Sequence, residues 1–93
     1  MKILAVCGFG VGSSMVLKMT LDKVVKELNL DADVSNTDIA TAKATKADVY
    51  FTSAELAPDL KESTDNPVIP IKKFMDKEEV KTALQKYLDS KKA

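Results

Sequence analysis

One short stretch of the sequence, residues 7–14 (CGFGVGSS), gathers the residue types that could do chemistry. Cys7 is the only cysteine of the chain, and it opens a run that contains all three glycines and ends in two serines. Glycines this closely spaced are costly in backbone entropy unless the local structure requires them. A loop that curls its backbone N–H groups around an anion is such a structure. The stretch therefore predicts an anion-binding loop that begins at a thiol.

The predicted loop would also act on the thiol itself. Backbone donors and a helix N-terminus stabilise negative charge, so a cysteine placed there ionises readily and becomes a nucleophile. After attack on phosphorus, the loop would hold the phosphoryl oxygens. Cys7 is thus the candidate catalytic residue, followed by a candidate phosphate-binding loop of Gly8, Phe9, Gly10, Val11, Gly12, Ser13 and Ser14. The competing interpretation is a small core cysteine followed by a plain tight turn.

Two better-known phosphate loops can be tested by spacing. A Walker A loop needs a Lys directly after its second glycine, but Gly12 is followed by Ser13, and the next lysine is Lys18. A dinucleotide fingerprint needs glycine in the sixth place of G-x-G-x-x-G, where GFGVGS has serine. Both loops are excluded.

Composition excludes further classes of chemistry. The chain has no His, no Arg and no Trp, so it cannot build a His-containing catalytic triad or a His- and Cys-rich zinc site, and we expect neither metal nor cofactor. A single cysteine also excludes an internal disulfide. The 14 basic residues, all Lys, balance 14 acidic ones, which removes the main electrostatic reason to expect a nucleic-acid partner.

Length and hydropathy predict a single domain, residues 1–93, of a cytoplasmic protein. The N-terminal apolar run is about five residues long before the glycines, whereas a secretory signal needs roughly seven to fifteen. No segment approaches the roughly 20 apolar residues of a membrane span, so we expect no insertion into a membrane. A reducing compartment would keep Cys7 as a thiol.

The elements that must position the loop follow from hydrophobic periodicity. Residues 2–6 form a short apolar run that indicates a buried strand. An amphipathic helix is predicted from Ser13 or Ser14, as N-cap, to near Asn29, with an apolar face of Leu17, Leu21, Val24, Val25 and Leu28.

The rest of the chain continues the alternation of strands and helices. We expect a strand over 31–38, a short helix over 39–46 capped by Asp38, a strand over 47–52, a loop or a single helical turn over 53–61, a strand over 67–71 and a helix over 77–92 capped by Asp76. Pro70 suggests that the last strand lies at an edge or ends there. This order implies an α/β fold, a parallel sheet with helices on both faces. Ligands of such sheets bind at the carboxyl ends of the strands, where the strand order reverses, and Cys7 falls there.

Other residues near the predicted site have weaker support for a functional role. Met15 and Met19, one helical turn apart, could face a partner, but packing in the core is the favoured interpretation. Residues 53–59, including Ser53, Glu55 and Asp59, could border the site by position alone. Lys72 and Lys73 are expected to be solvated.

Residues 3–19, ILAVCGFGVGSSMVLKM, resemble the phosphocysteine loop of the enzyme IIB components of the bacterial sugar phosphotransferase system (PTS). The ascorbate and galactitol types have loops of the form C-G-x-G-x-G-[ST]-S. The match is closest to the ascorbate type, which shares the Ser-Ser-Met followed by Lys-Met. The likeness covers the whole chain in length and element order, but its specific motif is confined to these residues.

The resemblance implies a cytoplasmic, four-stranded parallel domain of the flavodoxin-like or Rossmann-like kind. Such a domain accepts a phosphoryl group from a phosphohistidine of enzyme IIA and passes it to a sugar held by the membrane component, enzyme IIC. Cys7 matches the phosphorylated cysteine, and residues 8–14 match its loop. With no His in the chain, any phosphoryl carrier here must use another nucleophile.

Two other functions stay open on the sequence. A low-molecular-weight cysteine phosphatase or an arsenate reductase also places a cysteine loop after the first strand of a related fold. A non-catalytic anion-binding or regulatory module is the third candidate. Phosphoryl transfer from a phosphorylated partner would separate the first function from both, and turnover of a small phosphate ester would identify the second.

Overall fold

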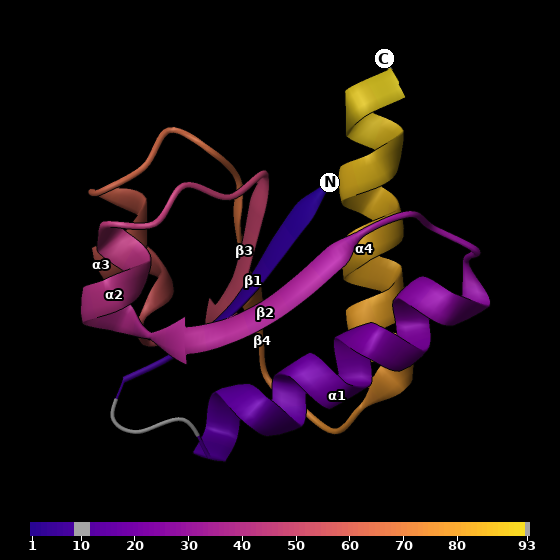
Figure 1. The fold of residues 1–93 in the computed structure, drawn as a ribbon, viewed down its shortest axis with the longest axis horizontal. Coiled ribbons are helices and arrows are strands. Elements are labelled where there is room, and N and C mark those ends of the chain that lie inside the picture. The colour runs from indigo at the N-terminus through magenta and orange to yellow at the C-terminus, as the bar shows by residue number, and fades with distance from the viewer. Residues whose placement is uncertain (9–11, 93) are drawn as a thin grey trace.

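The computed structural model describes residues 1–8 and 12–92, with only the backbone of residues 12–14, 91 and 92. Strands and helices alternate along this part of the chain (Figure 1). They are β1 (Lys2–Cys7), α1 (Gly12–Glu27), β2 (Asp33–Asp38), α2 (Ile39–Lys43), β3 (Val49–Ser53), α3 (Ala57–Lys61), β4 (Val68–Ile71) and α4 (Lys77–Lys92). The predicted order is confirmed, although several ends shift by a few residues. The segment 53–61, predicted as a loop or a single helical turn, contains the short helix α3.

The strands form one four-stranded sheet in the order β2-β1-β3-β4, and every neighbouring pair is parallel. Helices α1 and α4 cover one face of the sheet, and α2 and α3 cover the other (Figure 1). The fold is therefore the predicted three-layer α/β sandwich. The strand order reverses next to β1, because β2 lies on one side of β1 and β3 lies on the other side.

The central strand β1 is buried on both faces, as its continuous apolar run predicts. Ile3 and Ala5 pack in the core beneath α1 and α4, while Leu4 and Val6 pack in the core beneath α2 and α3. The alternation continues to Cys7, the last residue of the strand, which points toward the α1 side by the two-residue period of a strand.

The ends of the helices follow local hydrogen-bonding rules, with one exception to the sequence expectation. Asp38 accepts the N–H of Thr41, and Asp76 accepts the N–H groups of residues 78 and 79, so both predicted N-caps are confirmed. The cap predicted at Ser13 or Ser14 is wrong, because α1 already begins at Gly12 and places both serines inside its first turn.

Helix α1 ends just before Asn29, as expected. Asn29 has a positive φ of 52°, and the N–H of Leu30 donates to the carbonyl of Val25 at 3.0 Å. This is the left-handed closing turn in which glycine and asparagine are the favoured residues. At the far side of the sheet, β4 is an edge strand, and Pro70 lies within it as predicted.

Candidate active site

Cys7 lies at the carboxyl end of β1, next to the point where the strand order reverses. Its strand is flanked by β2 and β3, and helices cover both faces. The residue is 5% exposed. Because the sides and faces of β1 are covered by these elements, the open direction toward Cys7 runs over the carboxyl edge of the sheet. This is the ligand-binding position of open parallel sheets.

The loop that follows Cys7 is described in part. Gly8 lies close to the side chain of Leu56, the residue just before α3. A Cβ added to Gly8 would be 3.6 Å from Cδ1 of Leu56. Phe9, Gly10 and Val11, which the sequence assigns to the phosphate-binding loop, lie outside the described residues. Gly12, Ser13 and Ser14 form the first turn of α1. The N–H groups of a first helical turn have no partners within the helix and attract anions.

Two further residues border this site: Thr52, which sequence reasoning missed, and Leu56, which it included only as part of residues 53–59. Thr52 is fully buried, and its hydroxyl donates to the carbonyl of Val6 at 3.0 Å. Leu56 reaches Gly8 from the turn after β3. The only signal in the sequence is that both follow the apolar core of a strand, and that signal does not say which neighbouring strand they meet.

Two of the three polar residues proposed by position alone, Asp59 and Ser53, have other partners. Asp59 forms an ion pair with Lys43 at 3.0 Å. The hydroxyl oxygen of Ser53 accepts the N–H of Leu56 at 3.4 Å, within the turn itself. Glu55 is exposed. The structure thus brings the β3–α3 turn to the site through Leu56, while Asp59 is engaged with α2.

Asp38 is the acidic residue beside the thiol, because its Cα is paired with that of Cys7 in the register of β1 and β2. Its carboxylate accepts the backbone N–H of Thr41 at 2.8 Å. That hydrogen bond holds the pKa of Asp38 below its ordinary value. At neutral pH the group is ionised and cannot donate a proton.

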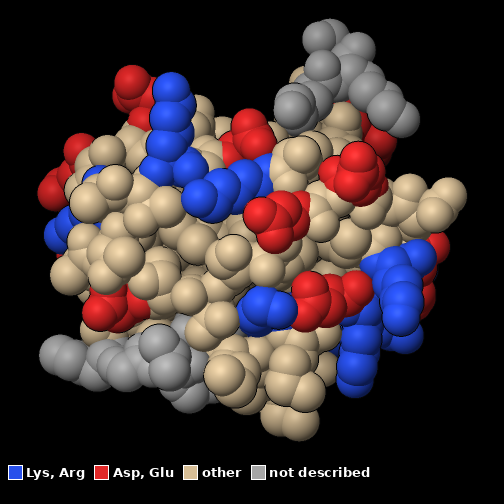
Figure 2. Space-filling view, viewed as in Figure 1, with Lys and Arg blue, Asp and Glu red and all other residues tan. Residues whose placement is uncertain are grey.

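The methionines of α1 form an exposed apolar stripe close to the site. Met15 is 50% exposed and Met19 is 57% exposed, so the favoured expectation of core packing is wrong. The physical reason is helical geometry: each lies two residues from the buried Leu17, about 200° around the helix. Uncharged side chains gather at the lower edge of Figure 2, where the N-terminal half of α1 runs.

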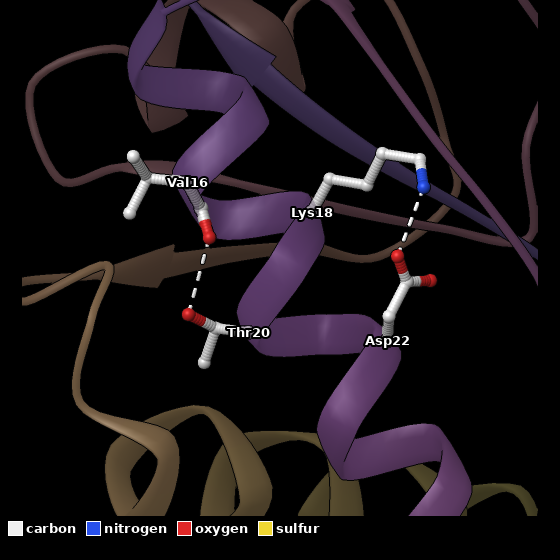
Figure 3. A network of polar contacts seen from close by, with 4 residues as sticks. All are labelled: Val16, Lys18, Thr20 and Asp22. Carbon is white, nitrogen blue, oxygen red and sulfur yellow. Dashed lines mark hydrogen bonds and ion pairs between the residues drawn. The ribbon is translucent and has the colours of Figure 1, made fainter.

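Residues 72–76, between β4 and α4, are attached to α1 and α4 at the same edge of the sheet. The hydroxyl of Thr20 lies 2.7 Å from the carbonyl of Phe74 and 3.1 Å from that of Val16, the second contact being drawn in Figure 3. On the opposite side of α1, Lys18 and Asp22 form an exposed ion pair. Met75 is 81% exposed beside this attachment.

Lys72 and Lys73 are exposed, as expected. Their backbone N–H groups donate to the two carboxylate oxygens of Glu79, at 2.7 and 3.0 Å. The segment before α4 is therefore held by its backbone, which leaves the two lysine side chains in solvent at the carboxyl edge of the sheet.

A groove of about 690 Å³ lies elsewhere, between β4 and α4. Its walls include Ile69, Ala83 and Tyr87. Strand β3 separates β4 from β1 and Cys7. The groove therefore belongs to a different part of the surface from the candidate active site.

The fold and the position of Cys7 define a small α/β protein with a cysteine loop at its ligand-binding edge. Residues 2–86 match the family model described as the lactose/cellobiose-specific IIB subunit of the PTS. The chain belongs to this family of PTS enzyme IIB proteins, and its general role is that of a sugar phosphotransferase component. Such components work together with IIA and IIC components. No helix in the described ranges has the length and apolar character needed to cross a bilayer.

Curated relatives carry a different sugar in their names. An ascorbate-specific PTS EIIB component from Mycoplasma pneumoniae is 31% identical over 90 residues, which are 95% of each chain. One of the same name from Escherichia coli O157:H7 is 30% identical over 76 residues, covering 80% of this chain and 75% of the relative. A solved lactose-specific IIB domain from Streptococcus pneumoniae superimposes with a TM-score of 0.69 over 96% of this chain and 95% of that one, at 13% identity.

Proposed function

We propose that Cys7 is the phosphorylated residue of this IIB protein and that residues 8–14 bind the phosphoryl group. The donor is a phosphohistidine of enzyme IIA, and the acceptor is a sugar of the ascorbate type held by the membrane component IIC. The observation that carries the proposal is the place of Cys7: it ends the central strand at the reversal of strand order and leads through the glycines into the first turn of α1. The cytoplasm is the compartment that would keep this thiol reduced.

The proposed reaction has two balanced steps. In the first, the sulfur of Cys7 attacks phosphorus, the S–P bond forms and the N–P bond of the donor breaks, and the thiol proton passes to the leaving imidazole nitrogen. In the second, a sugar hydroxyl attacks the same phosphorus, the O–P bond forms and the S–P bond breaks, and the hydroxyl proton is balanced by protonation of the released sulfur, which restores the thiol. Backbone N–H groups of the loop and of the first turn of α1 would hold the phosphoryl oxygens in both steps.

Two observations favour a carrier over a phosphatase. Cysteine phosphatases place an Arg six residues after the cysteine, where this chain has Ser13, and the chain contains no Arg. A phosphatase also needs an acid to protonate its leaving group. Asp38 is held ionised by Thr41, and Asp59 is paired with Lys43. The lack of an Arg and of an available acid among Asp38 and Asp59 suits a carrier, whose phosphocysteine must survive until the sugar arrives.

The methionine stripe of Met15 and Met19 supports a docking face for the phosphorylated partner. Direct transfer requires donor and acceptor atoms to meet, so the partner must cover the carboxyl edge around Cys7. The stripe begins in the second turn of the helix that follows the loop. Exposed apolar side chains next to a reactive centre are typical of a protein contact. The sequence also predicts that Phe9 or Val11 contacts a partner, with packing of both in the core as the equal alternative, and both residues lie outside the described ranges.

Phosphorylation in a reconstituted system tests the proposal. Wild-type protein is incubated with phosphoenolpyruvate, the general PTS proteins and the cognate IIA, and intact mass is followed. One phosphoryl group is expected on the wild type and none on Cys7→Ser. Labelling that survives the substitution would refute Cys7 as the acceptor. Membrane vesicles carrying IIC then distinguish the sugars: phosphorylation of ascorbate supports the ascorbate type, and phosphorylation of lactose or cellobiose in its place contradicts it.

A further inference from the structure

Thr52 is a polar residue among the buried residues of β3. Its side chain is fully buried, and its hydroxyl donates to the main-chain carbonyl of Val6, on the neighbouring strand, at 3.0 Å. Thr20 and Thr52 are the buried polar residues among those the structure describes. A buried hydroxyl without a hydrogen-bond partner lowers the stability of the folded state, so the hydrogen bond from Thr52 to Val6 is strongly favoured in the folded protein.

The contact lies where β1 and β3 begin to part. Their paired register runs from Ile3 opposite Val49 to Ala5 opposite Phe51. The carbonyl of Val6 comes directly after the last pair, and two residues later Gly8 meets Leu56. The hydroxyl of Thr52 thus ties the two strands together at the reversal of strand order, immediately before the thiol.

The carbonyl that Thr52 holds belongs to the peptide that leads into Cys7. A peptide unit is planar, so fixing the C=O of Val6 also fixes the N–H and the Cα of Cys7. The direction of the Cys7 side chain is set from that Cα. A rotation of this one peptide would move the sulfur relative to the loop and to any group approaching it.

We propose that Thr52 is a positioning residue for Cys7, a proposal that rests on the function proposed for the thiol. Thr52 does not touch the transferred group: it acts through the Val6 carbonyl to hold the sulfur in line for attack. Transfer between two macromolecules is sensitive to such placement, and a displacement of about 1 Å can slow a reaction by roughly a hundredfold.

Three variants separate the hydroxyl from the packing of the side chain. Thr52→Val keeps the branched shape and removes the donor, whereas Thr52→Ser keeps the donor and removes a methyl group. The matched control is Thr45→Val, because the hydroxyl of Thr45 also donates to a backbone carbonyl, that of Thr41 at 2.8 Å, within α2 and its C-terminal turn. Each protein is assayed well below its midpoint of thermal unfolding.

Single-turnover transfer from phosphorylated IIA at saturating concentration is the first measurement. Thr52→Val is expected to be slower than wild type by about tenfold or more, with an unchanged concentration dependence on the donor, while Thr52→Ser and Thr45→Val stay within about twofold. A wild-type rate in Thr52→Val overturns the proposal. So does a rate in Thr52→Ser as slow as in Thr52→Val, since packing would then be the cause. If Thr52→Val does not fold, Thr52→Ala takes its place with the same two criteria.

Alkylation of Cys7 by iodoacetamide is the second measurement, and it needs no partner. The rate constant is expected to change severalfold in Thr52→Val and to stay near wild type in Thr52→Ser and Thr45→Val. Equal rates in all four proteins would overturn the positioning role. Failure of the wild type to accept a phosphoryl group would instead refute the proposed function, and the alkylation series would still decide whether Thr52 places the sulfur.

Discussion

Asp38 lies directly opposite Cys7 in the parallel register of β1 and β2, and its carboxylate accepts the N–H of Thr41 at 2.8 Å. If Cys7 accepts a phosphoryl group as proposed, a negative charge on the neighbouring strand would oppose the approach of that anion. Here the charge is engaged by the start of α2, where a free N–H and the helix dipole stabilise it. The N-cap of α2 therefore favours the ionised form of the carboxylate opposite the proposed nucleophile.

The stability contributed by Asp38 should depend on acid pH. Because its pKa in the folded protein is lowered, the capping contribution is present above the pKa of the unfolded chain and is lost as pH falls through the folded-state value. Asp38→Asn keeps a capping oxygen but does not titrate. Urea unfolding at pH 7 and at about pH 3 should therefore show a smaller loss of stability on acidification in Asp38→Asn than in the wild type. Identical losses would contradict the assignment.

The purified protein should have almost no phosphatase activity. Loss of a key electrostatic stabiliser lowers rates by roughly a hundred- to a thousandfold, and this chain lacks the Arg that cysteine phosphatases use. Hydrolysis of para-nitrophenyl phosphate is expected to be barely above background, with Cys7→Ser as the control. Robust turnover that disappears in Cys7→Ser would overturn the carrier function in favour of a phosphatase.

Met19→Ser should weaken the encounter with IIA without unfolding the protein. The side chain is 57% exposed, so its replacement leaves the core intact. Steady-state phosphorylation should show KM for phosphorylated IIA raised by about tenfold, with kcat nearly unchanged, if the stripe lies at the centre of the contact. Lys26→Ser, an exposed change near the other end of α1, serves as the control. An unchanged KM in Met19→Ser would place the docking face elsewhere.

Substitutions of Asn29 should reveal the strain of the turn that ends α1. Its φ of 52° lies in the left-handed region, where a Cβ costs about 1 kcal/mol in residues other than Gly and Asn. Asn29→Ala is expected to lower the free energy of unfolding by about 1 kcal/mol. Asn29→Gly should show no such loss, because glycine adopts this conformation freely. Chemical denaturation of the three proteins checks both values, and an Ala variant as stable as wild type would exclude strain at this turn.

Local rules predicted much of the fold and the core of the candidate site. The apolar run of β1, the helical period of Leu17 and Leu21, and the caps at Asp38 and Asp76 depend on residues that are neighbours in the chain. The combination of Cys7 with the following glycines is equally local, and it pointed to the carboxyl edge of the sheet where Cys7 lies. Residues 9–11 of the loop rest on the sequence alone.

The surroundings of Cys7 were decided by the tertiary structure. The hydrogen bond from Thr52 to Val6, the approach of the Leu56 side chain to Gly8 and the pairing of Asp38 with Cys7 bring together residues that lie far apart in the chain. Such contacts depend on strand order and on register, and a shift of one residue turns every side chain of a strand to the opposite face. Periodicity within one segment carries no information on either quantity. Packing of the helices against both faces of the sheet selects the strand order and the register. These two properties in turn decide which residues meet at the thiol.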